Sequence, residues 1–170
     1  PWKIRLDPSD PTAFYLYADS SRMTRDVDPY ARQMMISQGT FLEYVAVAGE
    51  KEGWDTHIAL FPDGTYDEKN LARSMDTMPV AKVALSKAQP RSAPLYDAMF
   101  LPDTNREAYQ AEKLSTRQIS ALTSLSAGDG VSIRLYTDGA DLKKIGGYAL
   151  RSATIEAGVP RVMEESGAIF

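Results

Sequence analysis

The sequence predicts an α+β domain in which an antiparallel or mixed sheet is flanked by helices. Segments typical of strands and helices alternate along the chain, without the regular strand–helix–strand rhythm of a doubly wound parallel sheet. The first two strand segments are separated only by a short turn, so they can pair as a hairpin. The chain has 170 residues, 44% of them apolar and 25% charged, which suits a globular domain with a sizeable buried core.

The first four segments form the expected hairpin and the loop that follows it. Residues 2–6 alternate large apolar and basic side chains, as a half-exposed strand does. Residues 7–11 are rich in Asp and Pro and predict a turn. Residues 13–18 are rich in aromatic residues and predict the second strand, and the polar residues 19–28 predict a loop.

A long helix is expected next. Asp28 and Pro29 supply an N-cap and a first-turn proline, the helical pattern continues to about Lys51, and Gly53 can close the helix. Gly39 interrupts this helix at a cost of roughly 1 kcal/mol relative to alanine. We expect that Gly39 permits close packing against a neighbouring element, and close approach of a ligand is the alternative.

The remaining segments are shorter. Ser115 and Gln118 form a capping box that opens a helix, and Gly158 and Pro160 end the last predicted helix. In chain order we expect a strand at 56–61, a turn at 62–64, a polar helix at 67–75, a strand at 80–86, one or two helical turns at 95–100, a helix at 115–125, a strand at 131–136 and a helix at 140–156.

Composition excludes several classes of function. The formal charge of −4 provides no basic field for nucleic acid, and no apolar run approaches the roughly 18 residues of a membrane helix. The chain has no cysteine and a single histidine, His57, so thiol catalysis and multi-His metal sites are excluded. Glycine-rich nucleotide loops and the esterase motif G-x-S-x-G are absent.

One polar segment has the residue types of a phosphate site. Thr104, Asn105 and Arg106 place a hydroxyl, an amide and a guanidinium at consecutive positions, and these groups can converge on one phosphate. Taken alone, such a tripeptide is more often a turn with a surface charge.

Two motifs resemble the nitroreductase superfamily. The opening Pro1-Trp2-Lys3-Ile4 resembles the tail of the motif N-x-Q-P-W-[KR]-[FIV], and the segment TNREAYQAEKLSTRQISALTSL resembles the family's R-R-S-x-R-x-F start and the helix after it. The resemblance implies that Thr104, Asn105 and Arg106 contact the phosphate of FMN. It also implies that Tyr109 stands near the motif's aromatic position. Trp2 either packs near the flavin ring or belongs to the core.

The order of the motifs resembles the Acg-type branch of that superfamily, in which one chain carries two nitroreductase-like halves. Here a motif from the family's start follows elements of its middle and end, so we expect a piece of a longer, internally duplicated protein. Residues 1–88 would be the later part of the first half, 89–102 a linker and 103–170 the early part of the second half. The halves would form an intramolecular pseudo-dimer, or the protein a homodimer.

The resemblance implies an FMN-dependent oxidoreductase that passes hydride from NAD(P)H to a nitro compound or quinone. The flavin performs this chemistry, so we expect no catalytic side chain and no metal site. Two alternatives stay open: a protein of the same fold that only sequesters flavin, and an interaction module without flavin. The second is favoured by Pro102 and Asp103, which stand where the family has two arginines. The location is expected to be cytoplasmic, or exported if a twin-arginine signal lies upstream.

Overall fold

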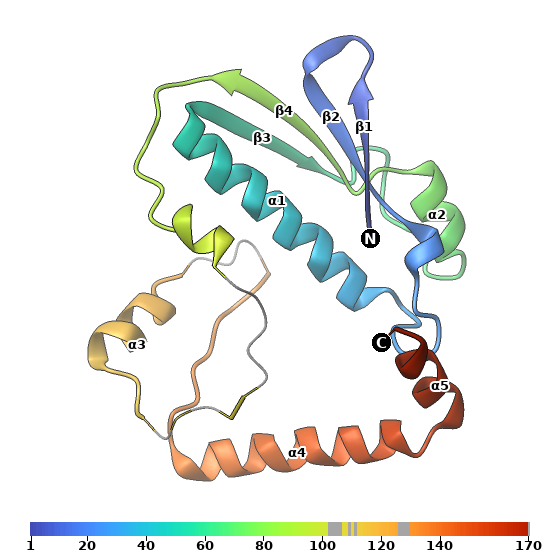
Figure 1. The fold of residues 1–170 in the computed structure, drawn as a ribbon, viewed down its shortest axis with the longest axis vertical. Coiled ribbons are helices and arrows are strands. Elements are labelled where there is room, and N and C mark those ends of the chain that lie inside the picture. The colour runs from blue at the N-terminus through green and yellow to red at the C-terminus, as the bar shows by residue number, and fades with distance from the viewer. Residues whose placement is uncertain (102–106, 109, 111, 126–129, 170) are drawn as a thin grey trace. The chain divides into compact units, whose positions relative to one another are not determined.

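The computed structural model describes residues 1–101, 107, 108, 110, 112–125 and 130–169 (Figure 1). It divides the chain into two compact units, one formed by Pro1–Asp103 with Glu165–Phe170 and the other by Thr104–Glu164. The described residues form a four-stranded antiparallel sheet and five α-helices. The predicted α+β class is therefore confirmed, and the fold is compatible with a nitroreductase-like arrangement.

The sheet belongs to the first unit and begins with the predicted hairpin. Its strand order is β1-β2-β4-β3, and every neighbouring pair is antiparallel. Ile4 lies opposite Leu16 in the hairpin, and Leu16 lies opposite Ala81 of the next strand. The strands are β1 (Trp2–Asp7), β2 (Asp10–Ala18), β3 (Trp54–Leu60) and β4 (Ala81–Lys87).

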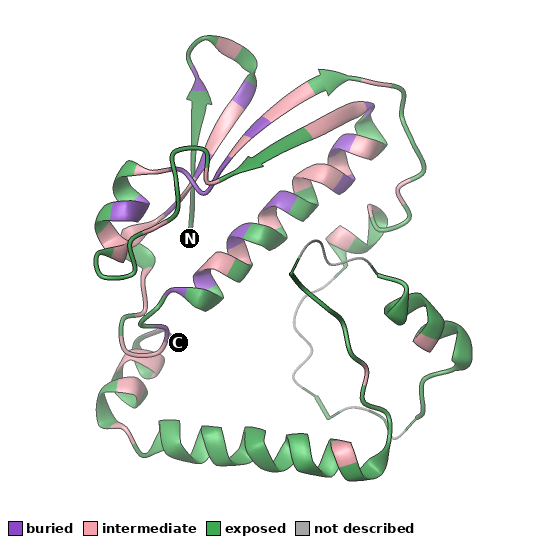
Figure 2. Ribbon diagram, turned by 180° about the vertical axis from the view of Figure 1, so that it is seen from behind, coloured by how far each residue is buried: buried purple, intermediate pink, exposed green. Residues whose placement is uncertain are grey.

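Helices of the first unit cover one face and one end of this sheet, with α1 lying along the face and α2 beside β2 (Figure 1). Buried residues follow the inner side of α1 and the two central strands (Figure 2). The core includes Leu16, Met34, Leu42, Met75 and Val83. The helical segments of this unit are η1 (Ser20–Arg22), α1 (Arg32–Glu52), α2 (Leu71–Thr77) and η2 (Asp97–Phe100).

The start of α1 differs in detail from the expected cap. The N-cap residue is Ala31, whose backbone is left-handed (φ 53°) and whose side chain cannot accept a hydrogen bond. Asp28 still caps the helix, because its Oδ1 accepts from the N–H of Arg32 (2.8 Å) and its Oδ2 from the N–H of Met34 (3.1 Å). At the other end Gly53 closes the helix with φ 75°, as predicted.

Close packing of α1 occurs at Gly49 rather than at Gly39. A Cβ atom added to Gly49 would lie 2.6 Å from Thr56 Oγ1 and 3.1 Å from the carbonyl oxygen of Trp54, both on β3. At Gly39 no described atom lies within 4 Å of the corresponding position, so the expectation for that residue is wrong. Gly49 therefore sets how closely the helix approaches the sheet.

The second unit contains α3 (Thr116–Thr123) and α4 (Gly139–Ala157). The capping box at Ser115 and Gln118 is confirmed, with both reciprocal hydrogen bonds present. The strand predicted at 131–136 is wrong, because no strand occurs among the described residues of this unit. An extended segment becomes a strand only when a neighbour accepts its backbone hydrogen bonds. Nearly all residues of α4 are exposed (Figure 2).

Gly158 and Val159 separate α4 from one more helix. Gly158 caps α4 as expected, but Pro160 also opens the next helix, α5 (Pro160–Ile169). Proline suits the first turn of a helix because its missing N–H would have no partner there. The residues from Glu165 onward belong to the first unit.

Candidate functional site

The structure describes one of the four residues predicted to bind a cofactor. Trp2 lies at the start of β1. Thr104, Asn105 and Arg106 lie outside the described residues. Their contact with a phosphate therefore stays a prediction, and the geometry of the site is built from Trp2 and its surroundings.

Trp2 is held along one edge by α1. Its Nε1–H donates to the carbonyl oxygen of Ser37 (3.2 Å), and its ring lies 5.5 Å from the ring of Phe41, tilted by 36°. The residue is nevertheless 47% exposed. Trp2 is thus a fixed indole with a large part of its surface open, which suits contact with a planar ligand.

Gln38 lies beside Trp2 and carries an unsatisfied polar atom. Its Nε2 donates to the carbonyl oxygen of Pro1 (3.2 Å), which orients the amide, and the residue is only 1% exposed. Its Oε1 has no hydrogen-bond partner among the described atoms. A buried acceptor without a donor costs about 1–3 kcal/mol. An N–H or O–H donor from a bound molecule or a water would remove this cost.

A pocket of about 350 Å³ opens at the start of α1. Three of its nine lining residues are aromatic. The ring of Phe61 meets that of Tyr66 edge-on at 5.7 Å, and the Arg32 guanidinium lies 5.3 Å from the centre of the Tyr30 ring. Sequence analysis selected none of these residues. The lining residues are Tyr30, Ala31, Arg32, Met35, Ile36, Phe61, Tyr66, Glu68 and Leu71.

The backbone of this pocket is strained at two positions. Ala31 (φ 53°) and Phe61 (φ 45°) are the non-glycine residues with positive φ in the described part of the chain, and both line the pocket. Such a conformation costs about 1–3 kcal/mol, and it tends to occur at ligand-binding sites. Two hydrogen bonds maintain it, from Ala31 N–H to Asp28 O (2.9 Å) and from Phe61 N–H to Val80 O (2.8 Å).

The chemistry of the pocket favours binding over acid–base catalysis. Tyr66 donates its phenolic hydrogen to the carbonyl oxygen of Met78 (2.9 Å), and burial raises its pKa to about 12. It therefore stays protonated at neutral pH. Three aromatic rings, the guanidinium of Arg32 and the carboxylate of Glu68 line the pocket, which suits a planar, electron-poor ring with polar substituents. Within the described ranges, no cluster of three or more His, Cys, Asp or Glu residues could hold a metal ion.

A second pocket, of about 330 Å³, lies against β1 and is a weaker candidate. Its cations already have partners: Lys3 forms an ion pair with Asp19 (2.9 Å), and Arg5 lies 5.6 Å from the centre of the Tyr17 ring. The hydrogen bond from Lys3 lowers the pKa of Asp19 to about 2, so this carboxylate stays charged. The Lys3–Asp19 pair is neutral overall and Asp76 also lines the pocket, so these carboxylates offset the positive charge of Arg5 for an anionic ligand.

The protein thus has an α+β fold, a fixed indole at Trp2 and the aromatic pocket at the first turns of α1. No family model matches the chain, and no solved structure matches it. Two curated proteins of Mycobacterium tuberculosis do match, and their names are "Putative NAD(P)H nitroreductase MT3217" and "Putative NAD(P)H nitroreductase Rv3131".

Each of these proteins is 29% identical to the chain over 138 residues. The alignment covers 79% of this chain and 36% of each relative, so the chain spans about a third of the length of the curated relatives it matches. The matches support a nitroreductase-like relation. In the part of the chain that the structure describes, no helix is both long and apolar enough to cross a membrane.

Proposed function

We propose that the chain is part of an FMN-binding, nitroreductase-like oxidoreductase. The observation that carries the proposal is the alignment over 138 residues with two proteins whose names specify NAD(P)H nitroreductases. When bound, FMN would carry hydride from NAD(P)H to a nitro compound or a quinone. In the Acg-type arrangement, residues 1–88 and 103–170 contribute to two successive halves joined by the linker 89–102.

The residues around Trp2 fit one part of a flavin. Trp2 offers an indole with an open surface, and Gln38 offers a buried oxygen that lacks a donor. An isoalloxazine ring has a planar surface that would complement the open indole. The Gln38 oxygen is enclosed, so a flavin N–H would reach it only after the side chain turns outward. In this proposal Thr104, Asn105 and Arg106 hold the phosphate.

The aromatic pocket would hold the second planar molecule, either the nicotinamide or the acceptor. Tyr30, Phe61 and Tyr66 would shield its ring from water, and Arg32 would attract the oxygens of a nitro or quinone group. None of these side chains needs to move a proton, because Tyr66 keeps its own at neutral pH. The protein would bind and orient, and the hydride chemistry belongs to the cofactor.

A titration with FMN tests the cofactor. The chain has two tryptophans, Trp2 and Trp54, so the variants Trp54→Phe and Trp2→Phe form a matched pair in which one indole at a time reports. Bound flavin should quench the emission of Trp2 in the Trp54→Phe protein more strongly than that of Trp54 in the Trp2→Phe protein. Flavin fluorescence that does not change at high micromolar protein would reject the proposal.

Two substitutions test the phosphate contact. A charge-assisted hydrogen bond contributes about 1.5–3 kcal/mol, so Arg106→Ala should weaken FMN binding by roughly ten- to a hundredfold. Asp103→Arg adds positive charge near the phosphate and should tighten binding, with a larger effect at low salt. If both affinities and both melting temperatures stay unchanged, this segment is not part of the site.

Turnover separates the proposed enzyme from the two alternatives. Oxidation of NADPH coupled to reduction of a quinone is expected of the enzyme. A protein that retains FMN but shows no such oxidation would be a flavin-sequestering member of the same fold. A colourless preparation that does not take up flavin would favour an interaction module.

A further inference from the structure

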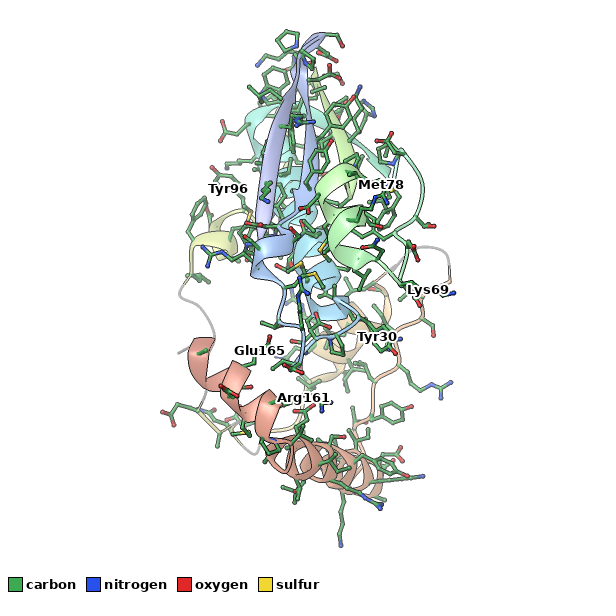
Figure 3. All side chains as sticks on the ribbon, turned by 90° about the vertical axis from the view of Figure 1, so that its right-hand side faces the viewer. Tyr30, Lys69, Met78, Tyr96, Arg161 and Glu165 are labelled. Atoms are coloured by element: carbon green, nitrogen blue, oxygen red, sulfur yellow. The ribbon has the colours of Figure 1, made fainter. Side chains whose placement is uncertain are left out.

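Three consecutive backbone N–H groups in the loop before α1 bind a single carboxylate. The N–H of Arg25 donates to Glu165 Oε1 (2.7 Å), and the N–H groups of Asp26 and Val27 donate to Glu165 Oε2 (2.9 and 2.7 Å). Glu165 comes from α5 and is partly buried against this loop (Figure 3). We call the three amides the Arg25–Val27 nest.

This geometry is typical of an anion-binding site. Successive backbone amides that point to one place form a concave donor set, which is suited to carboxylate and phosphate oxygens. Both oxygens of Glu165 are used, and all three hydrogen bonds are charge-assisted. The adjacent Glu164 is exposed, so α5 presents one carboxylate to the nest and the other to solvent.

The nest lies directly before the residues that shape the aromatic pocket. The N–H of Asp28 donates to the carbonyl oxygen of Thr24 (2.8 Å), which closes the loop around the nest. The carboxylate of Asp28 then caps α1, and its carbonyl oxygen accepts from the N–H of Ala31. Tyr30 and Arg32, on either side of the strained Ala31, are walls of the pocket.

We propose that Glu165 is a positioning residue for the aromatic pocket, acting through the Arg25–Val27 nest. Its carboxylate fixes the loop at 24–28, and the loop in turn holds Ala31 in its left-handed conformation between Tyr30 and Arg32. The ligand of the nest is a carboxylate, and in this chain the side chain of Glu165 supplies it. The inference depends on the pocket's geometry and holds whichever planar molecule the pocket takes.

The variant Glu165→Ala tests this role, with Glu164→Ala as the matched control. Amide hydrogen exchange at residues 25–27 should become roughly tenfold faster or more in Glu165→Ala, because three charge-assisted bonds are lost, and should not change in Glu164→Ala. The amide NMR resonances of Tyr30 to Arg32 should shift only in Glu165→Ala. Neither measurement requires flavin or turnover, so a failure here is distinguishable from failure of the proposed function.

Chemical rescue tests the nest as an anion site. Sodium acetate added to Glu165→Ala should slow exchange at residues 25–27 again and return the resonances of Tyr30 to Arg32 toward their original positions. Sodium chloride at the same ionic strength should do neither. If Glu165→Ala does not fold, Glu165→Gln tests the exchange rates and resonances without acetate, since it keeps the shape of the side chain but removes its charge.

Three results would overturn the inference. Equal exchange rates in the Glu165 and Glu164 variants would show that the nest does not depend on the carboxylate. Faster exchange at the nest with unchanged resonances at Tyr30 to Arg32 would show that the nest does not position the pocket. Equal effects of acetate and chloride would show that the nest does not recognise a carboxylate.

Discussion

Replacement of two glycines in α1 by alanine should have opposite effects on stability. Gly39→Ala and Gly49→Ala make the same chemical change in the same helix. At Gly39 the new Cβ meets no described atom within 4 Å, whereas at Gly49 it would lie 2.6 Å from Thr56 Oγ1 and 3.1 Å from the carbonyl oxygen of Trp54. Comparison of the two variants isolates the cost of moving α1 away from β3.

The magnitude follows from two contributions. Alanine is better than glycine in a helix interior by about 1 kcal/mol, and this gain is common to both variants. Overpacking costs about 1–3 kcal/mol, and only Gly49→Ala incurs it. Gly39→Ala should therefore stabilise the protein by up to about 1 kcal/mol, and Gly49→Ala should be less stable than Gly39→Ala by about 1–3 kcal/mol.

Thermal unfolding followed by circular dichroism measures this difference. For a protein of this size, 1 kcal/mol corresponds to roughly 2–4 °C in melting temperature, so the two variants should differ by several degrees. Thr56→Ala removes the nearest clashing atom. In the Gly49→Ala background it should recover part of the loss, and the double-mutant cycle should give a coupling energy of about 0.5–3 kcal/mol.

Equal stabilisation by the two alanines would refute the reasoning. It would mean that α1 does not approach β3 closely at Gly49. A large loss in Gly49→Ala that Thr56→Ala leaves unchanged would place the clash at the Trp54 carbonyl alone. In that case the backbone, which cannot rotate away, would account for the whole cost.

Further predictions concern three polar side chains of the first unit. A hydrogen bond from Lys82 (2.8 Å) holds the pKa of Asp7 well below its usual range. The Asp7 carboxylate therefore stabilises the fold above about pH 4, and this contribution fades as the pH falls, so Asp7→Asn should flatten the dependence of melting temperature on pH in acid. Asp28→Ala removes two bonds to the start of α1 and should cost about 1–2 kcal/mol by urea unfolding. Tyr66 should ionise only near pH 12 in an ultraviolet titration, and Tyr66→Phe should remove that late step.

Local patterns predicted the strands and the long helix of the first unit well. The hairpin of β1 and β2 follows from alternation on both sides of a short turn, and Gly53 closes α1 because glycine adopts the left-handed conformation without cost. Although α1 begins later than expected, Asp28 still caps it as predicted. Its carboxylate accepts hydrogen bonds from the first turn of the helix, although Asp28 lies three residues before the N-cap residue Ala31.

Two predictions failed because tertiary structure decided the outcome. Residues 131–136 have the composition of a strand, but the pattern of side chains does not supply the backbone neighbour that a strand requires. The same reason explains Gly39 and Gly49. Both are glycines in one helix, and only the position of β3 decides which of them is needed for packing.

The aromatic pocket was missed because backbone conformation creates it. Selection by residue type favours polar side chains such as those of Thr104 to Arg106, and it passes over Ala31 and Phe61, which have no preference for positive φ. Hydrogen bonds to the carbonyl oxygens of Asp28 and Val80 impose that conformation, and these acceptors lie in a loop and just before β4. Tertiary structure therefore balances the strain at Ala31 and Phe61. Because both strained residues line the same pocket, this pocket is the best-supported binding site among the described residues.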